Sequence, residues 1–193
     1  MKTYLSIENR KFPLITGLIC LLFVACLQKE EPKPFVGDKT FYTAAPNLLY
    51  FKNVRSSYYY RSRKPNSKKD LYDFRKFERT SKRPVLLPRI VNNWLEDETY
   101  IFLERNKFPG FADSLVVLSG LPADSSSQRI RLAIPTKKAQ YEFAVAMYEE
   151  ILAGRSLFIL SKEEEWLPLY QDGDERSSFK IVMQDYLKLV SSK

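Results

Sequence analysis

ETYIFL (residues 98–103) and LVVL (residues 115–118) indicate a β-sheet at the centre of this chain. Both runs are rich in the aromatic and β-branched residues that favour strands, and Pro109-Gly110 breaks the chain between them. Residues 129–134 then alternate charged and apolar side chains, which is typical of a strand with one face in water. The connections are short, whereas parallel neighbours need a crossover of about a dozen residues. The sequence therefore predicts an antiparallel arrangement.

Downstream of residue 135 the apolar period becomes helical. Tyr141, Val145 and Tyr148 recur at helical spacing after Thr136, a favourable N-cap, and Gly154 ends the pattern. This predicts a helix over 137–153. A second apolar stripe predicts a last helix from about residue 175, with members Phe179, Val182, Met183, Tyr186, Leu187 and Val190.

Four shorter runs also favour strands, at residues 48–51, 58–60, 156–160 and 166–170. Strands in the first part of the chain and helices near its end are typical of an α+β protein. We expect a mostly antiparallel sheet with two amphipathic helices, both in the C-terminal third, packed on it.

The first thirty residues are organised as a signal peptide. Lys2, Arg10 and Lys11 form a basic leader, and residues 14–25 form an apolar run of about a dozen residues. That run is shorter than the roughly 20 residues that a transmembrane helix needs. We therefore predict cleavage before Cys26.

Val24-Ala25-Cys26 resembles the lipobox of bacterial lipoproteins, although Phe23 departs from the usual leucine. Residues 27–31 (LQKEE) are similar to the export signal of surface-displayed lipoproteins of the Bacteroidota. The resemblance implies lipidation of Cys26, anchorage in the outer membrane, and exposure to the periplasm or the cell surface. An uncleaved N-terminal helix, ordinary secretion and, for residues 27–31, a plain solvated tether remain alternatives.

These features divide the chain into a signal peptide (1–25), a lipidated flexible tether (26–39) and a single α+β globular domain (40–193). The tether contains prolines, a glycine and several charges. About 168 residues remain after cleavage, which suffices for one hydrophobic core. Cys20 leaves with the signal peptide, so the mature domain is expected to contain no disulfide.

The basic character of the protein is concentrated in residues 52–89. This segment contains thirteen lysines and arginines and three acids, which gives a net charge of about +10, whereas residues 90–193 carry about −4. Such a field attracts phosphate, anionic lipid, acidic polysaccharide or an acidic protein patch.

Aromatic residues are interleaved with the bases of this segment, which makes it the candidate binding surface. An exported protein rarely meets nucleic acid, so a stacking platform for nucleic acid is disfavoured. The alternative is a solvated face, with the aromatic residues in the core. The candidate residues are Tyr58, Tyr59, Tyr60, Arg61, Arg63, Lys64, Arg75 and Lys76.

The absence of histidine restricts catalysis, since it excludes Ser-His-Asp triads, Cys-His pairs and histidine-ligated metals. No phosphate-binding glycine loop appears. Carboxylates remain, at residues 163–165 and at Asp172, Asp174 and Glu175, but the sequence does not fix the roughly 5–10 Å spacing of a glycosidase pair. Residues 172–174 lack the other ligands of an EF-hand. We expect no catalytic residue, metal or cofactor.

Two functions follow as hypotheses. The first is a noncatalytic lipoprotein of the cell envelope, tethered to the membrane, whose basic aromatic segment docks an envelope protein or an anionic surface polymer. The second is a glycan-binding or carbohydrate-active lipoprotein that uses Trp94, Trp166 or the tyrosines as sugar platforms. Burial of both tryptophans, together with the absence of a cleft that gathers two carboxylates, would weigh against the second hypothesis.

Overall fold

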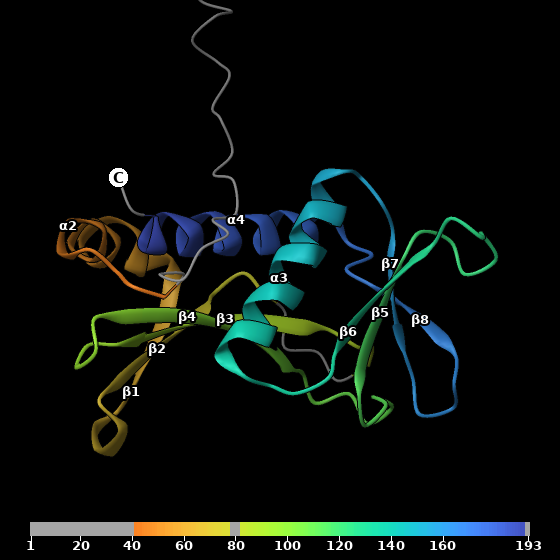
Figure 1. Cartoon of the computed structure of the whole chain (residues 1–193), viewed down its shortest axis with the longest axis horizontal. Helices are drawn as coiled ribbons and strands as arrows, with labels where there is room; N and C mark the ends of the chain where they lie inside the picture. Colours follow the sequence, from red (N-terminus) through yellow and green to blue (C-terminus); the bar gives the residue numbers. More distant parts are fainter. Residues whose placement is uncertain (1–40, 78–81, 192–193) are drawn as a thin grey trace, which may run out of the picture. The chain divides into compact units, whose positions relative to one another are not determined.

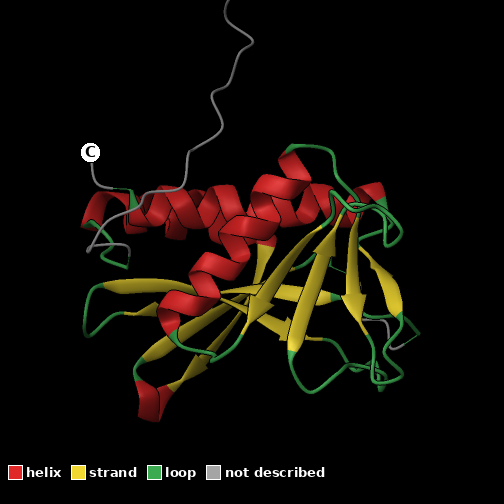
Figure 2. Ribbon diagram, turned by 45° about the vertical axis from the view of Figure 1, so that its right-hand side comes forward, coloured by secondary structure: helices red, strands yellow, loops and turns green. Residues whose placement is uncertain are grey.

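Residues 41–77 and 82–191 are described by the computed structural model (Figure 1). Within these residues, the strands form two four-stranded antiparallel sheets, and two long helices follow in the C-terminal third (Figure 2). The α+β class with antiparallel strands is thereby confirmed. The expectation of one sheet is wrong, because the strands divide into two.

The first sheet is a meander whose spatial order, β1-β2-β3-β4, follows the chain. Its strands are β1 (Tyr59–Lys64), β2 (Lys69–Phe74), β3 (Leu86–Asn93) and β4 (Glu98–Arg105). Short connections explain this order: residues 65–67 form a 3₁₀ turn, and Asp97 adopts a positive φ of 50° between β3 and β4. Strand β1 is therefore an edge strand.

The second sheet has the order β6-β5-β7-β8. Its strands are β5 (Leu115–Ser119), β6 (Gln128–Leu132), β7 (Leu157–Leu160) and β8 (Trp166–Leu169). All five residues of β5 are buried. Strand β5 pairs with β6 on one side and with β7 on the other, so it is not available to extend the first sheet from β4.

Helix α3 (Lys137–Leu152) begins at Thr136, whose side chain accepts a 3.1 Å hydrogen bond from the Ala139 backbone N–H. It is followed by Gly154, which has a φ of 75°. Helix α4 (Gly173–Val190) begins at Asp172, whose carboxylate accepts a bond from the Asp174 N–H. The two predicted helices are confirmed, and their bounds differ from the prediction by one or two residues.

One hydrophobic core draws residues from both sheets and both long helices. Helix α3 contacts strands of both sheets, and α4 contacts β3 and β4. In α3, the buried Gln140 side chain accepts a 3.0 Å hydrogen bond from the Leu103 backbone N–H in β4. Tyr170 donates its hydroxyl hydrogen to the Leu86 carbonyl in β3. These buried polar bonds join α3 to β4, and the residue that follows β8 to β3.

The segment before β1 is helical, so the predicted strand at residues 48–51 is wrong. Helix α2 (Ala45–Tyr50) continues as a π-helical turn (Phe51–Arg55) and a 3₁₀ turn (Ser56–Tyr58). Pro46 lies in the first turn of α2, where a missing backbone N–H removes no helical bond. The apolar run at 48–51 is too short to have a period of its own.

Candidate functional site

The predicted signal peptide (1–25), the lipidation site Cys26 and the tether (26–39) lie outside the described residues, as does the side chain of Lys64. Among the residues that the structure describes, no helix has the length and hydropathy needed to cross a bilayer. The other candidate residues can be placed.

The three consecutive tyrosines separate into one buried and two exposed side chains. Tyr59 is 1% exposed, whereas Tyr58 and Tyr60 are 49% and 58% exposed. The side chains of β1 alternate between the two faces of the sheet, so Tyr59 points into the core and Tyr60 points away from it. Tyr59 cannot contact a partner and is removed from the candidate binding surface.

Tyr59 and Arg55 converge on a buried acid of helix α4. Asp185 accepts hydrogen bonds of 2.8 and 3.0 Å from the Arg55 guanidinium and one of 2.7 Å from the Tyr59 hydroxyl. Burial raises the pKa of the Tyr59 phenol well above its ordinary value, and the neighbouring Asp185 charge raises it further. The hydrogen bond to Asp185 also raises the pKa of Arg55. This cluster stabilises the fold.

Arg61 and Arg63 share a second buried acid, Asp70 of β2. Asp70 is 1% exposed, and its carboxylate lies 2.6 Å from Arg61 Nη2 and 2.9 Å from Arg63 Nε. Burial favours the neutral acid, but the hydrogen bonds from Arg63 and Arg61 outweigh it, so the pKa of Asp70 is lowered. Both arginines are therefore held by one internal acid, which offsets one of their two charges.

The last arginines of the basic segment are paired too. Arg83 Nη1 lies 2.8 Å from Glu175 at the start of α4. Arg89 Nε lies 2.6 Å from Asp73, and its Nη2 lies 2.8 Å from Glu104. Acids from β4 and α4 thus offset part of the net charge counted along residues 52–89.

An exposed aromatic surface remains around the start of β1. The Arg55 guanidinium lies 4.7 Å from the centre of the Tyr58 ring, and that of Arg75 lies 5.1 Å from the centre of the Tyr60 ring. The Arg75 backbone N–H also donates to the Tyr58 carbonyl, 3.0 Å away, which brings the two stacked pairs together. Lys76 follows and is exposed. We call Tyr58, Tyr60, Arg75 and Lys76 the tyrosine surface.

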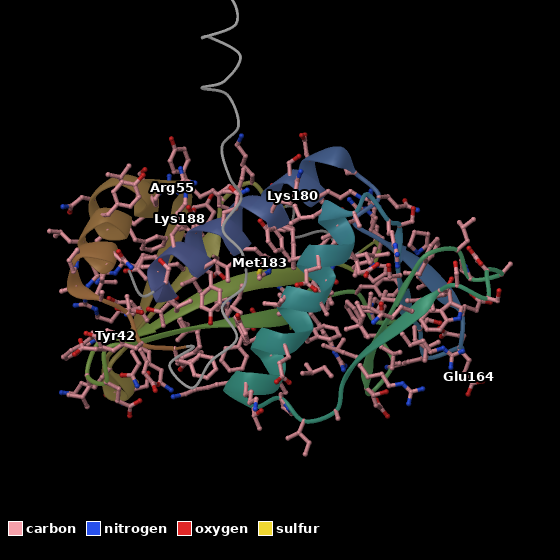
Figure 3. The ribbon with its side chains drawn as sticks, turned by 45° about the horizontal axis from the view of Figure 1, so that its top comes forward. Tyr42, Arg55, Glu164, Lys180, Met183 and Lys188 are labelled. Carbon is pink, nitrogen blue, oxygen red and sulfur yellow. The ribbon has the colours of Figure 1, made fainter. Side chains whose placement is uncertain are left out.

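Two apolar side chains of the preceding helical segment extend this surface. Tyr50 and Val54 are 52% and 48% exposed, and they lie eight and four residues before Tyr58 in the same helical segment. A shallow pocket of about 230 Å³ lies between the helical segment and the end of α4, and Tyr50, Arg55, Asp185 and Lys188 contribute to its lining. Arg55 and Lys188 lie close together in Figure 3.

A larger groove, of about 390 Å³, lies on the face of the first sheet that points away from the main core. Its floor is a separate apolar cluster of Leu71, Val91 and Tyr100, against which Phe102 packs. No local sequence pattern indicates this groove, because its residues come from three strands and meet only through the register Leu71–Val91–Tyr100.

Neither tryptophan is buried. Trp94 is 43% exposed in the β3–β4 turn, with Lys68 Nζ 5.3 Å from its ring centre. Trp166 is partly exposed and lines a third groove of about 230 Å³, which contains one carboxylate, Glu164. Of the predicted acids, Glu163 and Glu165 are exposed beside it, while Asp172 caps α4. The acids of residues 172–175 serve helix α4 and ion pairs.

Among residues 41–77 and 82–191, no cluster of three or more acids and cysteines has the geometry to hold a metal ion. The chain matches no protein family model, no curated protein and no solved structure. The surfaces of the described residues are therefore the basis for a functional proposal.

Proposed function

We propose that this protein is a lipoprotein of the outer membrane, anchored through Cys26, that acts as a noncatalytic binding or accessory module. The tyrosine surface is its partner site. The observation that supports this role is the pair of exposed tyrosines, each stacked against an arginine, beside exposed Tyr50 and Val54. Tyrosine and arginine are the residues that dominate the energetics of protein interfaces.

The chemistry of this surface favours a protein partner over an anionic polymer. Acids from outside the segment hold Arg55, Arg83 and Arg89, so the segment offers less positive charge than its sequence suggests. Beside Arg75 and Lys76, the exposed side chains of Tyr58, Tyr60 and Val54 supply aromatic and aliphatic area. Side chains of this kind are enriched in the centre of protein interfaces.

The two C-terminal helices packed on the sheet are part of this proposal. Helix α4 supplies Asp185, which fixes Arg55 and Tyr59 on either side of Tyr58. A surface held by a buried ion pair loses little conformational entropy on binding. We therefore propose that α4 preorganises the tyrosine surface.

The test is co-purification of the full-length tagged chain from detergent-solubilised membranes after crosslinking. Wild type should retain a stoichiometric envelope protein, and the double variant Tyr58→Ser/Tyr60→Ser should lose it, with an affinity decrease of roughly tenfold or more. Both side chains are exposed, so the variant should keep the melting temperature of the wild type.

A matched control removes equally exposed apolar side chains from elsewhere. Leu121→Ser/Ile134→Ser changes residues that are 62% and 67% exposed, and it should bind as wild type does. Retention of the partner by the tyrosine variant would exclude the tyrosine surface. The absence of any stoichiometric partner from wild type would exclude the binding role.

A further inference from the structure

The face of the second sheet that points away from the core carries a cationic and aromatic groove. The register aligns Arg131 (β6), Val116 (β5), Leu160 (β7) and Trp166 (β8) in one row across the sheet. The neighbouring row contains Arg129, Leu118, Phe158 and Pro168. Val116, Leu160 and Trp166 form the apolar lining of the groove of about 230 Å³, and the two arginines border it.

Arg129 and Arg131 differ from most arginines of this protein. Both are exposed, and among the described residues neither has a carboxylate within ion-pair distance. Internal acids hold Arg55, Arg61, Arg63, Arg83, Arg89 and Arg155. The second sheet therefore carries two exposed arginines that are free to meet a ligand, outside the basic segment of residues 52–89.

The aromatic wall of the groove is held in place. The Arg129 guanidinium lies 5.8 Å from the centre of the Trp166 ring. The turn before Trp166 is fixed by backbone bonds: Ser161 N–H donates to the Glu165 carbonyl at 2.9 Å, and Lys162 N–H donates to the Gly110 carbonyl at 3.0 Å. The groove therefore needs little reorganisation to bind.

One acid also lines the groove. Glu164, with a backbone φ of 61°, stands in the turn between β7 and β8. Its carboxylate disfavours ligands of dense negative charge such as a phosphodiester chain, because like charges repel. It can accept hydrogen bonds from hydroxyl groups. The preferred ligand thus combines an isolated anionic group with hydroxyl donors.

We infer that this groove binds one acidic sugar unit of a uronate-containing polysaccharide. The planar carboxylate matches the guanidinium fork of Arg129 or Arg131. The C–H face of the sugar ring packs against the indole of Trp166, whose π-face is electron-rich. Glu164 accepts bonds from the ring hydroxyls. The role is recognition, since the groove contains one carboxylate where a glycosidase uses two.

The size and position of the groove fit a chain of sugars. Its volume of about 230 Å³ is below the roughly 300–1,000 Å³ typical of pockets that enclose a drug-sized ligand. It therefore accommodates a single unit and leaves the neighbouring units outside. The arginines lie on β6, an edge strand, so a polymer can run past them without obstruction.

Tryptophan fluorescence provides a direct test, because the chain contains only Trp94 and Trp166. In full-length Trp94→Phe protein in detergent, Trp166 is the sole reporter. Titration with polygalacturonate should change its emission saturably, and carboxyl-reduced polygalacturonate should not. Binding should weaken at about 1 M salt, where the screening length falls to about 3 Å.

Charge-matched variants in the same background locate the site. Arg129→Gln/Arg131→Gln should weaken binding roughly tenfold or more, because two charged hydrogen-bond donors are lost. Lys107→Gln/Lys138→Gln removes the same charge from other exposed positions and should leave the affinity unchanged. Each substituted residue is exposed, and an unchanged melting temperature verifies the fold of each variant.

Three results would overturn the inference: equal binding of the carboxyl-reduced polymer, wild-type affinity of the arginine variant, or equal or tighter binding of polyglutamate or single-stranded DNA. The Tyr58→Ser/Tyr60→Ser variant separates this site from the tyrosine surface. It should bind polygalacturonate normally, so loss of the protein partner and loss of the sugar are independent outcomes.

Discussion

The Tyr59 hydroxyl donates a 2.7 Å hydrogen bond to Asp185, which lies 126 residues further along the chain. Asp185 also accepts both hydrogen bonds of Arg55, so one buried carboxylate joins β1, the preceding helical segment and α4. The middle tyrosine of the triplet therefore serves the fold. Its neighbours Tyr58 and Tyr60 are exposed.

Replacing Asp185 by asparagine should lower the free energy of unfolding by about 3 kcal/mol, because it breaks a buried ion pair and leaves Arg55 without its acid. Urea denaturation followed by circular dichroism measures the change. Glu142→Gln is the control: this exposed acid of α3 lies 4.0 Å from Lys138, and its loss should change stability by less than about 0.5 kcal/mol. Equal effects of the two substitutions would contradict the role of Asp185.

Removing single hydroxyl groups distinguishes the buried tyrosine from the exposed ones. Tyr59→Phe should cost about 1.5 kcal/mol, since it deletes a hydrogen bond to a charged acceptor and keeps the ring in the core. Tyr60→Phe should be neutral within about 0.5 kcal/mol. Thermal denaturation of both variants checks this order, which would be reversed if Tyr60 were the core residue.

Protonation of Asp70 in acid should lower the free energy of unfolding. Its pKa is lower in the folded protein than the ordinary value of 3.8, so its contribution is complete above that value and is lost as the pH falls through the folded pKa. Asp70→Asn should therefore cost about 3 kcal/mol at pH 7. The difference from wild type should shrink below about pH 4, where wild type also becomes protonated. A constant difference between pH 7 and pH 2 would show that Asp70 is not the titrating group.

Two glycines should respond differently to alanine. Gly154 has a φ of 75° after α3, and an added methyl group would meet open space, so Gly154→Ala should cost about 1 kcal/mol of backbone strain alone. Gly173 also has open space but no positive φ, and it starts α4. Gly173→Ala should be neutral or stabilise by up to about 1 kcal/mol. Chemical denaturation of the pair measures the contrast, and similar values would refute the backbone argument.

Local patterns predict much of the secondary structure. Thr136 as a cap and Gly154 as a stop define α3, because both act on the nearest turn of the helix. The strand runs at residues 98–103 and 115–118 are recognisable in the same way. The short apolar run at 48–51 predicts the wrong element, since four apolar residues fit either a buried strand or a helix.

Features set by distant residues could not be predicted. The short connection from β5 to β6 favours their antiparallel pairing, but nothing in the sequence near β5 indicates that it also pairs with β7 and starts a second sheet. The charge of the candidate site could not be predicted for the same reason. Counting charges along residues 52–89 misses the acids Glu175 and Asp185, which neutralise Arg83 and Arg55 from α4. The exposed Arg129 and Arg131 lie in the part of the chain, residues 90–193, whose net charge is negative.

Metabolic labelling with radioactive palmitate tests the central claim, membrane anchorage through Cys26, most directly. Cells expressing wild-type chain or Cys26→Ser are labelled, and the protein is immunoprecipitated and counted. The wild type should carry label and Cys26→Ser should carry none, with comparable amounts of protein recovered. An unlabelled wild type, or equal label on both chains, would contradict the anchor and with it the assignment to the outer membrane.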